Sequence, residues 1–150
     1  MATSLVKVLI HVVFSTKHRR PFITETLRSE LYPFMGGVVR RKGSAILVLG
    51  GMPDHVHLLL RLKSDSSLAE LIRALKATSS KWVHEKPDGN PEFAWQMGYA
   101  GFSVSQSMVR AVTSYILNQE AHHARVGFEQ ELVETLKRHE VDFDPRDICD

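Results

Sequence analysis

The chain has 150 residues, of which 43% are hydrophobic and 24% are charged, and its formal net charge is only +2. This composition is typical of one folded domain, expected to span residues 1–150, and it excludes a disordered chain. No stretch approaches the roughly 20 apolar residues of a membrane-spanning helix. Residues 1–8 lack a secretory signal, and the single cysteine, Cys149, excludes an internal disulfide. A cytoplasmic protein that makes no membrane contact is therefore expected.

The first half of the chain is predicted to begin with a strand and a helix. Residues 5–14 are rich in Val, Ile and Leu, a composition that favours a buried strand. Residues 24–42 carry apolar side chains close to helical spacing, and they end just before Gly43, where a helix stop is expected. Pro33 should kink this helix or divide it, because proline lacks the N–H that the helix needs.

A hairpin and a second helix follow. Residues 45–49 and 55–62 predict two strands, and the turn-forming residues 50–54 between them indicate an antiparallel hairpin. Ser67 begins a capping box, so a helix is expected over residues 67–85.

The second half is predicted to be mainly helical. Residues 93–104 contain aromatic side chains and one or two short strand-like runs. Ser105 can cap a helix that continues to about residue 124, and residues 128–139 form a final amphipathic helix. The complete order of elements predicts an α+β fold: a ferredoxin-like sandwich of one mainly antiparallel sheet with helices on a face, plus an added C-terminal helical segment.

A histidine pair opens the third predicted strand. His55 and His57 are two residues apart, so on a strand both imidazoles face the same side and can reach one metal ion. Val56, Leu58 and Leu60 then alternate toward the core. One such pair is a weak metal signal, since it is equally typical of surface or hydrogen-bonded structural histidines, and a third ligand must come from elsewhere.

An apolar stripe on the third predicted helix carries two polar side chains. Met108, Val112, Tyr115 and Gln119 recur at spacings of four, three and four residues. On one interpretation Tyr115 is a core aromatic and Gln119 is exposed where the stripe ends. On the other, the Gln119 carbonyl oxygen is the third metal ligand and Tyr115 attacks a metal-bound phosphate, which gives a covalent phosphotyrosine and a free 3′ hydroxyl. Mixed nitrogen and oxygen ligation fits Mg²⁺ or Mn²⁺ and leaves Zn²⁺ or Ni²⁺ open.

Several ordered motifs resemble small single-tyrosine HUH transposases, which include insertion-sequence and REP-associated tyrosine transposases. Residues 52–60, Met-Pro-Asp-His-Val-His-Leu-Leu-Leu, resemble the HUH motif, and residues 95–105 resemble the segment before the catalytic helix. Residues 115–123 resemble that helix itself. Residues 128–132 and 144–146 resemble the C-terminal part of the REP-associated branch, so the similarity covers nearly the whole chain.

This resemblance implies a function and a set of partners. It implies that Tyr115 is the nucleophile of a metal-dependent single-stranded DNA endonuclease and strand transferase, and that His55, His57 and Gln119 hold Mg²⁺ or Mn²⁺. It also implies a 5′-phosphotyrosine intermediate and single-stranded DNA that carries a hairpin. A homodimer is expected, in which the tyrosine helix of one subunit can complete the site of the other as in insertion-sequence relatives; a monomer, with the site formed in one chain, is the alternative for the REP-associated branch.

Basic and aromatic side chains are candidates for the contacts to DNA, because single-stranded DNA is bound by basic grooves with aromatic platforms. The candidate phosphate contacts are Arg19, Arg20, Arg40, Arg41, Lys76, Lys81 and Arg110. The candidate stacking residues are Trp82, Trp95, Tyr99 and Phe102, most of which are expected to belong to the core. His122 and His123 are expected to be exposed near the end of their helix, and the alternative is that one of them lies near the site.

Two other functions remain open from the residues alone. A ferredoxin-like sheet can serve as a non-catalytic module that binds single-stranded nucleic acid. A metal-dependent hydrolase could use water in place of Tyr115. A covalent protein–DNA adduct separates the three hypotheses, because only the transferase forms one.

Overall fold

Four strands form one antiparallel sheet in the order β2-β3-β1-β4 in the computed structural model, which describes residues 3–148. The strands are β1 (Val8–Ser15), β2 (Ala45–Met52), β3 (His55–Leu62) and β4 (Ala100–Val104). The first two helices are α1 (Glu25–Arg41), between β1 and β2, and α2 (Leu68–Glu85), between β3 and β4. This order of elements and strands confirms the predicted α+β, ferredoxin-like fold.

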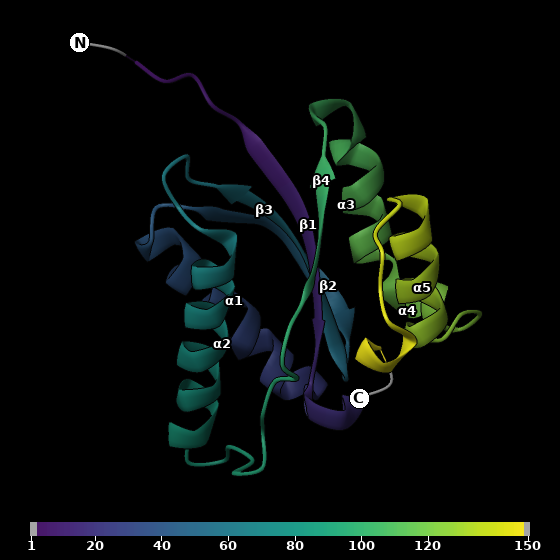
Figure 1. Cartoon of the computed structure of the whole chain (residues 1–150). Helices are drawn as coiled ribbons and strands as arrows, with labels where there is room; N and C mark the ends of the chain where they lie inside the picture. The colour runs from purple at the N-terminus through teal and green to yellow at the C-terminus, as the bar shows by residue number, and fades with distance from the viewer. Residues whose placement is uncertain (1–2, 149–150) are drawn as a thin grey trace.

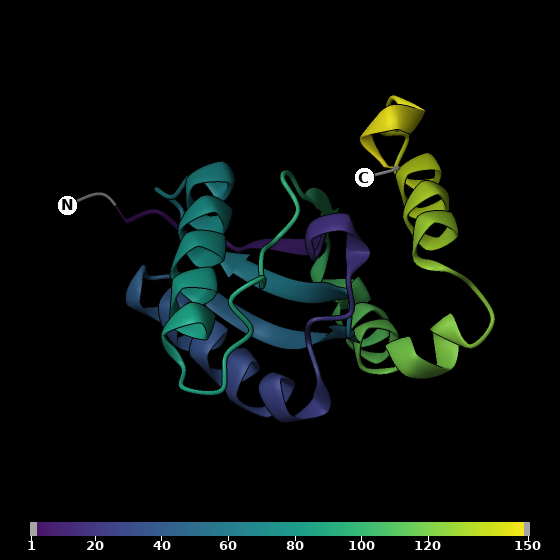
Figure 2. The same cartoon turned by 90° about the horizontal axis from the view of Figure 1, so that it is seen from below.

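The C-terminal segment covers the second face of the sheet. Helices α1 and α2 lie on one side of the strands, and α3 (Val109–Leu117), α4 (Gln119–His123) and α5 (Phe128–Arg138) lie on the other (Figure 1). Figure 2 shows the chain leaving α4 through an outward loop before α5 begins. Short 3₁₀ turns occur at η1 (Lys17–Arg19), η2 (Gln106–Met108) and η3 (Pro145–Asp147). No helix within residues 3–148 is long and apolar enough to cross a membrane.

Burial on both faces explains the apolar character of the central strands. Val12 and Leu58 belong to the core beneath α1 and α2. Leu9 and Leu59 point the other way and pack with Ile116 of α3. Leu59 interrupts a simple alternation in the sequence because its face is also covered, as in sheets sandwiched between helices.

Two predicted boundaries in the first half were wrong, and the division of the first helix that was one of the two outcomes expected at Pro33 does not occur. Pro33 lies inside an undivided α1, because Leu31 and Met35 on either side of it are both fully buried and hold the helix to the sheet. The first strand begins at Val8, whose partner Leu62 is the last residue of β3, so residues 5–7 have no neighbouring strand. Strand β2 runs on to Met52, which leaves residues 53–54 as the turn.

The third predicted helix is broken. A regular α-helix begins only at Val109, and the Ser105 hydroxyl contacts Ser107 rather than capping the helix. Asn118 adopts φ −103° and ψ 25°, outside the helical region, and separates α3 from α4. Tyr115 and Gln119 therefore lie on two consecutive helices instead of one.

Gly50 of β2 allows α3 to approach the sheet. A Cβ atom at Gly50 would lie 2.4 Å from the Ile116 carbonyl oxygen, one residue after Tyr115. The substitution Gly50→Ala is expected to lower the free energy of unfolding by about 1–3 kcal/mol, the usual cost of overpacking, because α3 must move away from β2. Urea denaturation measures the change.

Gly37→Ala provides the matched control. Gly37 lies within α1, and a Cβ there would meet no atom within 4 Å. This variant is expected to be as stable as the native chain or slightly more stable, because alanine favours helix more than glycine does. Equal stability of the Gly50 and Gly37 variants would contradict the tight α3–β2 contact.

Candidate metal and tyrosine site

The two predicted histidines of β3 are buried beneath the C-terminal helices. His55 and His57 are each 1% exposed and lie on the sheet face that α3, α4 and α5 cover. Their Nε2 atoms point toward the same oxygen, Glu131 Oε1 of α5, at 3.7 Å from His55 and 3.0 Å from His57. The strand geometry therefore brings both imidazoles to one point, as their spacing predicts.

Each imidazole is held through its other nitrogen. His55 Nδ1 donates to Asp54 Oδ1 at 2.7 Å, which leaves its Nε2 lone pair directed inward. His57 Nδ1 lies 2.9 Å from His11 Nε2, on the neighbouring strand β1. Hydrogen bonds of this kind fix the tautomer and the ring orientation of a histidine that holds a metal.

Glu131 is the centre of the hydrogen-bond network. It is 3% exposed, and its Oε1 also accepts from His123 Nε2 at 3.2 Å. Its Oε2 accepts a hydrogen bond from the Tyr115 hydroxyl. Burial acts to raise the pKa of Glu131, but the hydrogen bonds that it accepts from His57 and Tyr115 outweigh this effect and lower the pKa to about 2. The carboxyl group is therefore ionised and acts only as an acceptor.

Neutral histidines make this arrangement possible. Burial lowers the pKa of His57, and burial is also the largest cause that lowers the pKa of His11, to about 3. Because Glu131 only accepts, His57 Nε2 donates to it, and His57 Nδ1 accepts from His11. A cation on His57 Nε2 requires the reverse, with His57 Nδ1 donating to His11, and a neutral His11 can adopt either tautomer.

Tyr115 and Gln119 reach the same network from α3 and α4. Gln119 is 1% exposed, and its amide nitrogen donates to the Tyr115 carbonyl oxygen at 3.2 Å. This bond directs Gln119 Oε1 toward His55 Nε2, 3.4 Å away. Burial raises the pKa of the Tyr115 phenol, and the hydrogen bond and charge of Glu131 raise it further. Tyr115 is thus a neutral phenol in this environment.

The donor set fits a divalent cation. Nε2 of His55 and Oε1 of Gln119 lie 3.4 Å apart, so an imidazole nitrogen and an amide oxygen meet where a cation could bind both. One donor atom from each of His55, His57, His123 and Glu131 lies within 4.8 Å of the others. Imidazole nitrogens and oxygens together suit Mn²⁺ better than Mg²⁺, which prefers oxygen ligands.

Two residues of this site could not be assigned from the sequence, and one was misplaced. His123 was expected to be exposed, but its side chain is only 7% exposed because α4 turns it toward Glu131. Glu131 follows Phe128 by three residues on the buried stripe of α5. A carboxylate on an apolar stripe was the sequence feature that could have indicated a site residue here. His11 was hidden within an apolar strand.

The basic residues predicted to contact DNA differ in whether they already form an ion pair or hydrogen bond within the protein. Three form ion pairs with carboxylates: Arg19 with Glu129, Arg20 with Glu92, and Lys81 with Glu85. Lys76 donates to the carbonyl oxygens of residues 96 and 98, and burial lowers its pKa to about 8. The remaining three, Arg40, Arg41 and Arg110, are exposed and form no ion pair within residues 3–148.

The predicted stacking residues are mostly in the core. Trp95 and Phe102 are buried. Trp82 stacks on Phe34 with ring centroids 4.6 Å apart. Tyr99, 39% exposed, has the most accessible ring of the four.

The acid stability of the fold should depend on His11. The unfolded chain protonates this imidazole below pH 6.5, whereas the folded chain resists protonation down to about pH 3. The unfolded state therefore binds more protons in this window, and stability falls as pH decreases through it, by at most about 1.4 kcal/mol per pH unit from this group. Urea unfolding at about pH 7 and about pH 5 in EDTA should show a smaller loss for His11→Gln than for the native chain. An identical loss would show that His11 is not held neutral.

Comparisons with known proteins show which family this chain resembles. A family model described as "Transposase IS200 like" matches residues 4–119. The ISDra2 transposase TnpA of Deinococcus radiodurans is 24% identical over 116 residues, which are 73% of this chain and 81% of that protein.

Two solved structures share the fold. A crystal structure from Deinococcus radiodurans R1, described as a transposase, superposes with a TM-score of 0.62 and 23% identity, covering 79% of this chain and 95% of that one. A REP-associated tyrosine transposase bound to a REP hairpin superposes with a TM-score of 0.63 and 16% identity, covering 97% and 92%.

Proposed function

The chain belongs to the family of IS200-like transposases, and we propose that it is a metal-dependent single-stranded DNA endonuclease and strand transferase with Tyr115 as its nucleophile. The observation that carries this proposal is the meeting of the Tyr115 hydroxyl and the His57 imidazole on one buried carboxylate, Glu131. A nucleophile and a set of metal donors thus share one site within a single chain.

The proposed reaction transfers a phosphoryl linkage from DNA to protein. The Tyr115 oxygen forms a bond to phosphorus while the bond from phosphorus to the 3′ oxygen breaks. Tyr115 loses its proton, and the leaving 3′ oxygen gains one. The product is a 5′-phosphotyrosine and a free 3′ hydroxyl, and a second 3′ hydroxyl can reverse the step to join a new strand.

His55, His57 and Gln119 are the proposed ligands of Mg²⁺ or Mn²⁺, with Glu131 and His123 placed to join them. The bound ion would polarise the phosphate as a Lewis acid. Asp54 and His11 would keep the imidazoles aimed at the ion through their Nδ1 atoms.

Glu131 is the nearest acceptor for the Tyr115 proton. While this carboxylate is unshielded, its charge raises the pKa of Tyr115 and keeps the phenol neutral. A cation beside Glu131 would offset that charge and lower the pKa of Tyr115, so binding of the metal should also activate the nucleophile.

Hairpin-bearing single-stranded DNA is the proposed substrate. A structural relative is described as bound to a REP hairpin, and the exposed cations Arg40, Arg41 and Arg110 are free to contact phosphates. The meeting of His55, His57, Tyr115 and Gln119 within one chain supports a site that a single subunit can form. A homodimer stays a prediction, to be tested by light scattering.

Formation of a covalent adduct tests the proposal. The native chain, incubated with Mn²⁺ or Mg²⁺ and a labelled hairpin oligonucleotide, is expected to give a protein–DNA band that survives denaturing electrophoresis and disappears with EDTA. The hairpin can be chosen from palindromes that flank the gene. Binding without an adduct, across several hairpins and both metals, would instead support a non-catalytic binding module.

A further inference from the structure

A cavity of about 520 Å³ opens beside Tyr115. Its floor includes His11 of β1 and Phe102 of β4, one wall is α3 with Val112 and Tyr115, and the other is the last turn of α5 with Arg138. Glu131 lies two turns earlier on α5, and Tyr115, which lines the cavity, donates its hydroxyl hydrogen bond to Glu131. Its volume lies within the range of small-ligand sites, about 300–1,000 Å³.

The walls combine apolar surface with one free cation. Met108 and Val112 present apolar side chains to the cavity, and Met108 is 51% exposed. Arg138 is exposed and forms no ion pair within residues 3–148. An apolar wall beside a guanidinium is suited to a base or sugar and the phosphate attached to it.

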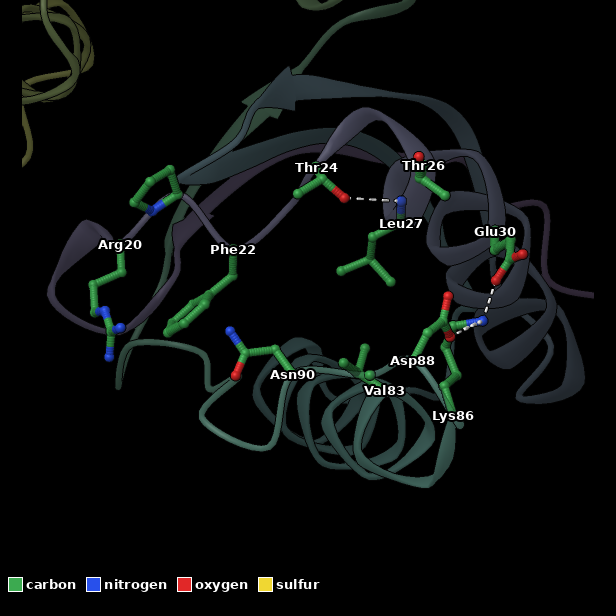
Figure 3. Close-up of a pocket in the computed structure, with 12 residues that line it drawn as sticks. Arg20, Phe22, Thr24, Thr26, Leu27, Glu30, Val83, Lys86, Asp88 and Asn90 are labelled. Carbon is green, nitrogen blue, oxygen red and sulfur yellow. Dashed lines mark hydrogen bonds and ion pairs between the residues drawn. The ribbon is translucent and has the colours of Figure 1, made fainter.

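Another cavity of the molecule lacks an unpaired charge. A cavity of about 360 Å³ lies between the start of α1 and the end of α2 (Figure 3). Its cations are already neutralised: Lys86 pairs with Glu30 and Asp88, and Arg20 pairs with Glu92. That cavity offers no unpaired charge to an anion, whereas the cavity beside Tyr115 does.

The geometry of the proposed reaction determines which nucleotide of the DNA can occupy the cavity beside Tyr115. In an in-line attack the leaving 3′ oxygen lies opposite the tyrosine oxygen across the phosphorus. A cavity on the tyrosine's own side therefore cannot hold the leaving strand. It can hold the nucleotide that remains attached to the phosphate through its 5′ oxygen.

We propose that this cavity binds the nucleotide on the 3′ side of the scissile phosphate, with Arg138 contacting the next phosphate of the strand and the Met108–Val112 wall contacting the base or sugar. The inference rests on the proposed function, which supplies the scissile phosphate at Tyr115. It adds a role for α5, which lies beyond the residues that the family model matches.

Charge removal provides the first test. Arg138→Ala is compared with Lys137→Ala, which removes an equal charge from the neighbouring exposed position outside the cavity. In a Tyr115→Phe background, fluorescence anisotropy measures binding of a labelled single-stranded oligothymidylate. Arg138→Ala is expected to bind roughly fivefold more weakly and to lower the slope of log K against log salt by about 0.7, the value for one phosphate contact on a single strand. Equal effects of the two variants would overturn the proposal.

Position along the strand provides the second test. The cleavage position is first mapped with the native chain, and an abasic nucleotide is then placed on the 3′ or the 5′ side of it. Adduct formation is expected to slow more for the 3′ abasic substrate, and Ala111→Trp, which fills the cavity from an exposed helix position, should remove this difference. Equal slowing at the two positions would overturn the cavity assignment. Absence of any adduct from the native chain would instead overturn the proposed function.

Discussion

Replacing Tyr115 by phenylalanine is expected to eliminate the covalent adduct and to lower the rate of strand cleavage by roughly 10³-fold or more, as the loss of a nucleophile does in other covalent enzymes. The phenylalanine ring keeps the edge contact that Tyr115 makes with His57, at 5.7 Å between centroids, so the packing of α3 should be preserved. Only the hydroxyl that donates to Glu131 is lost. Affinity for the hairpin oligonucleotide should stay within about twofold of the native value.

The control for this variant is Tyr99→Phe. Tyr99 is half-exposed and its hydroxyl forms no hydrogen bond within residues 3–148, so removal of that hydroxyl should leave both cleavage and adduct formation intact. Cleavage that survives in Tyr115→Phe without an adduct would show that water is the nucleophile. Such a result would support a metal-dependent hydrolase instead of a strand transferase.

The substitution with the next largest expected effect is His57→Ala. It removes a proposed ligand and also the donor that holds Glu131 at 3.0 Å. Affinity for Mn²⁺ is expected to fall by roughly 100-fold or more, since even the loss of a residue that only orients a ligand costs 10–100-fold. Isothermal titration calorimetry without DNA measures this loss independently of activity, and adduct formation should disappear in parallel.

His18→Asn is the control for the histidine variant. His18 is exposed and adopts a left-handed backbone conformation, with φ 55°, that asparagine also tolerates. Its Mn²⁺ affinity should match that of the native chain. If His57→Ala kept that affinity as well, the two imidazoles of β3 would not form the metal site.

The sequence was sufficient for the fold class and for the idea that four side chains converge. The i to i+2 spacing of His55 and His57 is a local property of a strand, and it brings both imidazoles to one face whatever the rest of the chain does. Tyr115 and Gln119 come together even though Asn118 breaks their helix, because the Gln119 amide reaches back to the Tyr115 carbonyl. The predicted contact is present, but the single helix that was expected to produce it is not.

The remaining residues of the site depend on long-range docking that local patterns do not encode. Glu131 reaches His57 across 74 positions of sequence, and it does so only because α5 folds back over β1 and β4. The burial of His123 follows from the same docking. His11 is adjacent to His57 because β1 pairs with β3, a register that no pattern within residues 5–14 specifies.

The central position of β1 has a consequence for how the chain folds during synthesis. This strand is made first, yet its two neighbours are β3 and β4, and Leu9 pairs with Val104. One edge of β1 therefore stays unpaired until nearly all of the sheet has left the ribosome. Pairings this distant slow folding and lengthen the exposure of an apolar strand to other chains. The run Val8–Ser15 therefore stays exposed through most of synthesis, and synthesis without chaperones should give aggregates that contain it.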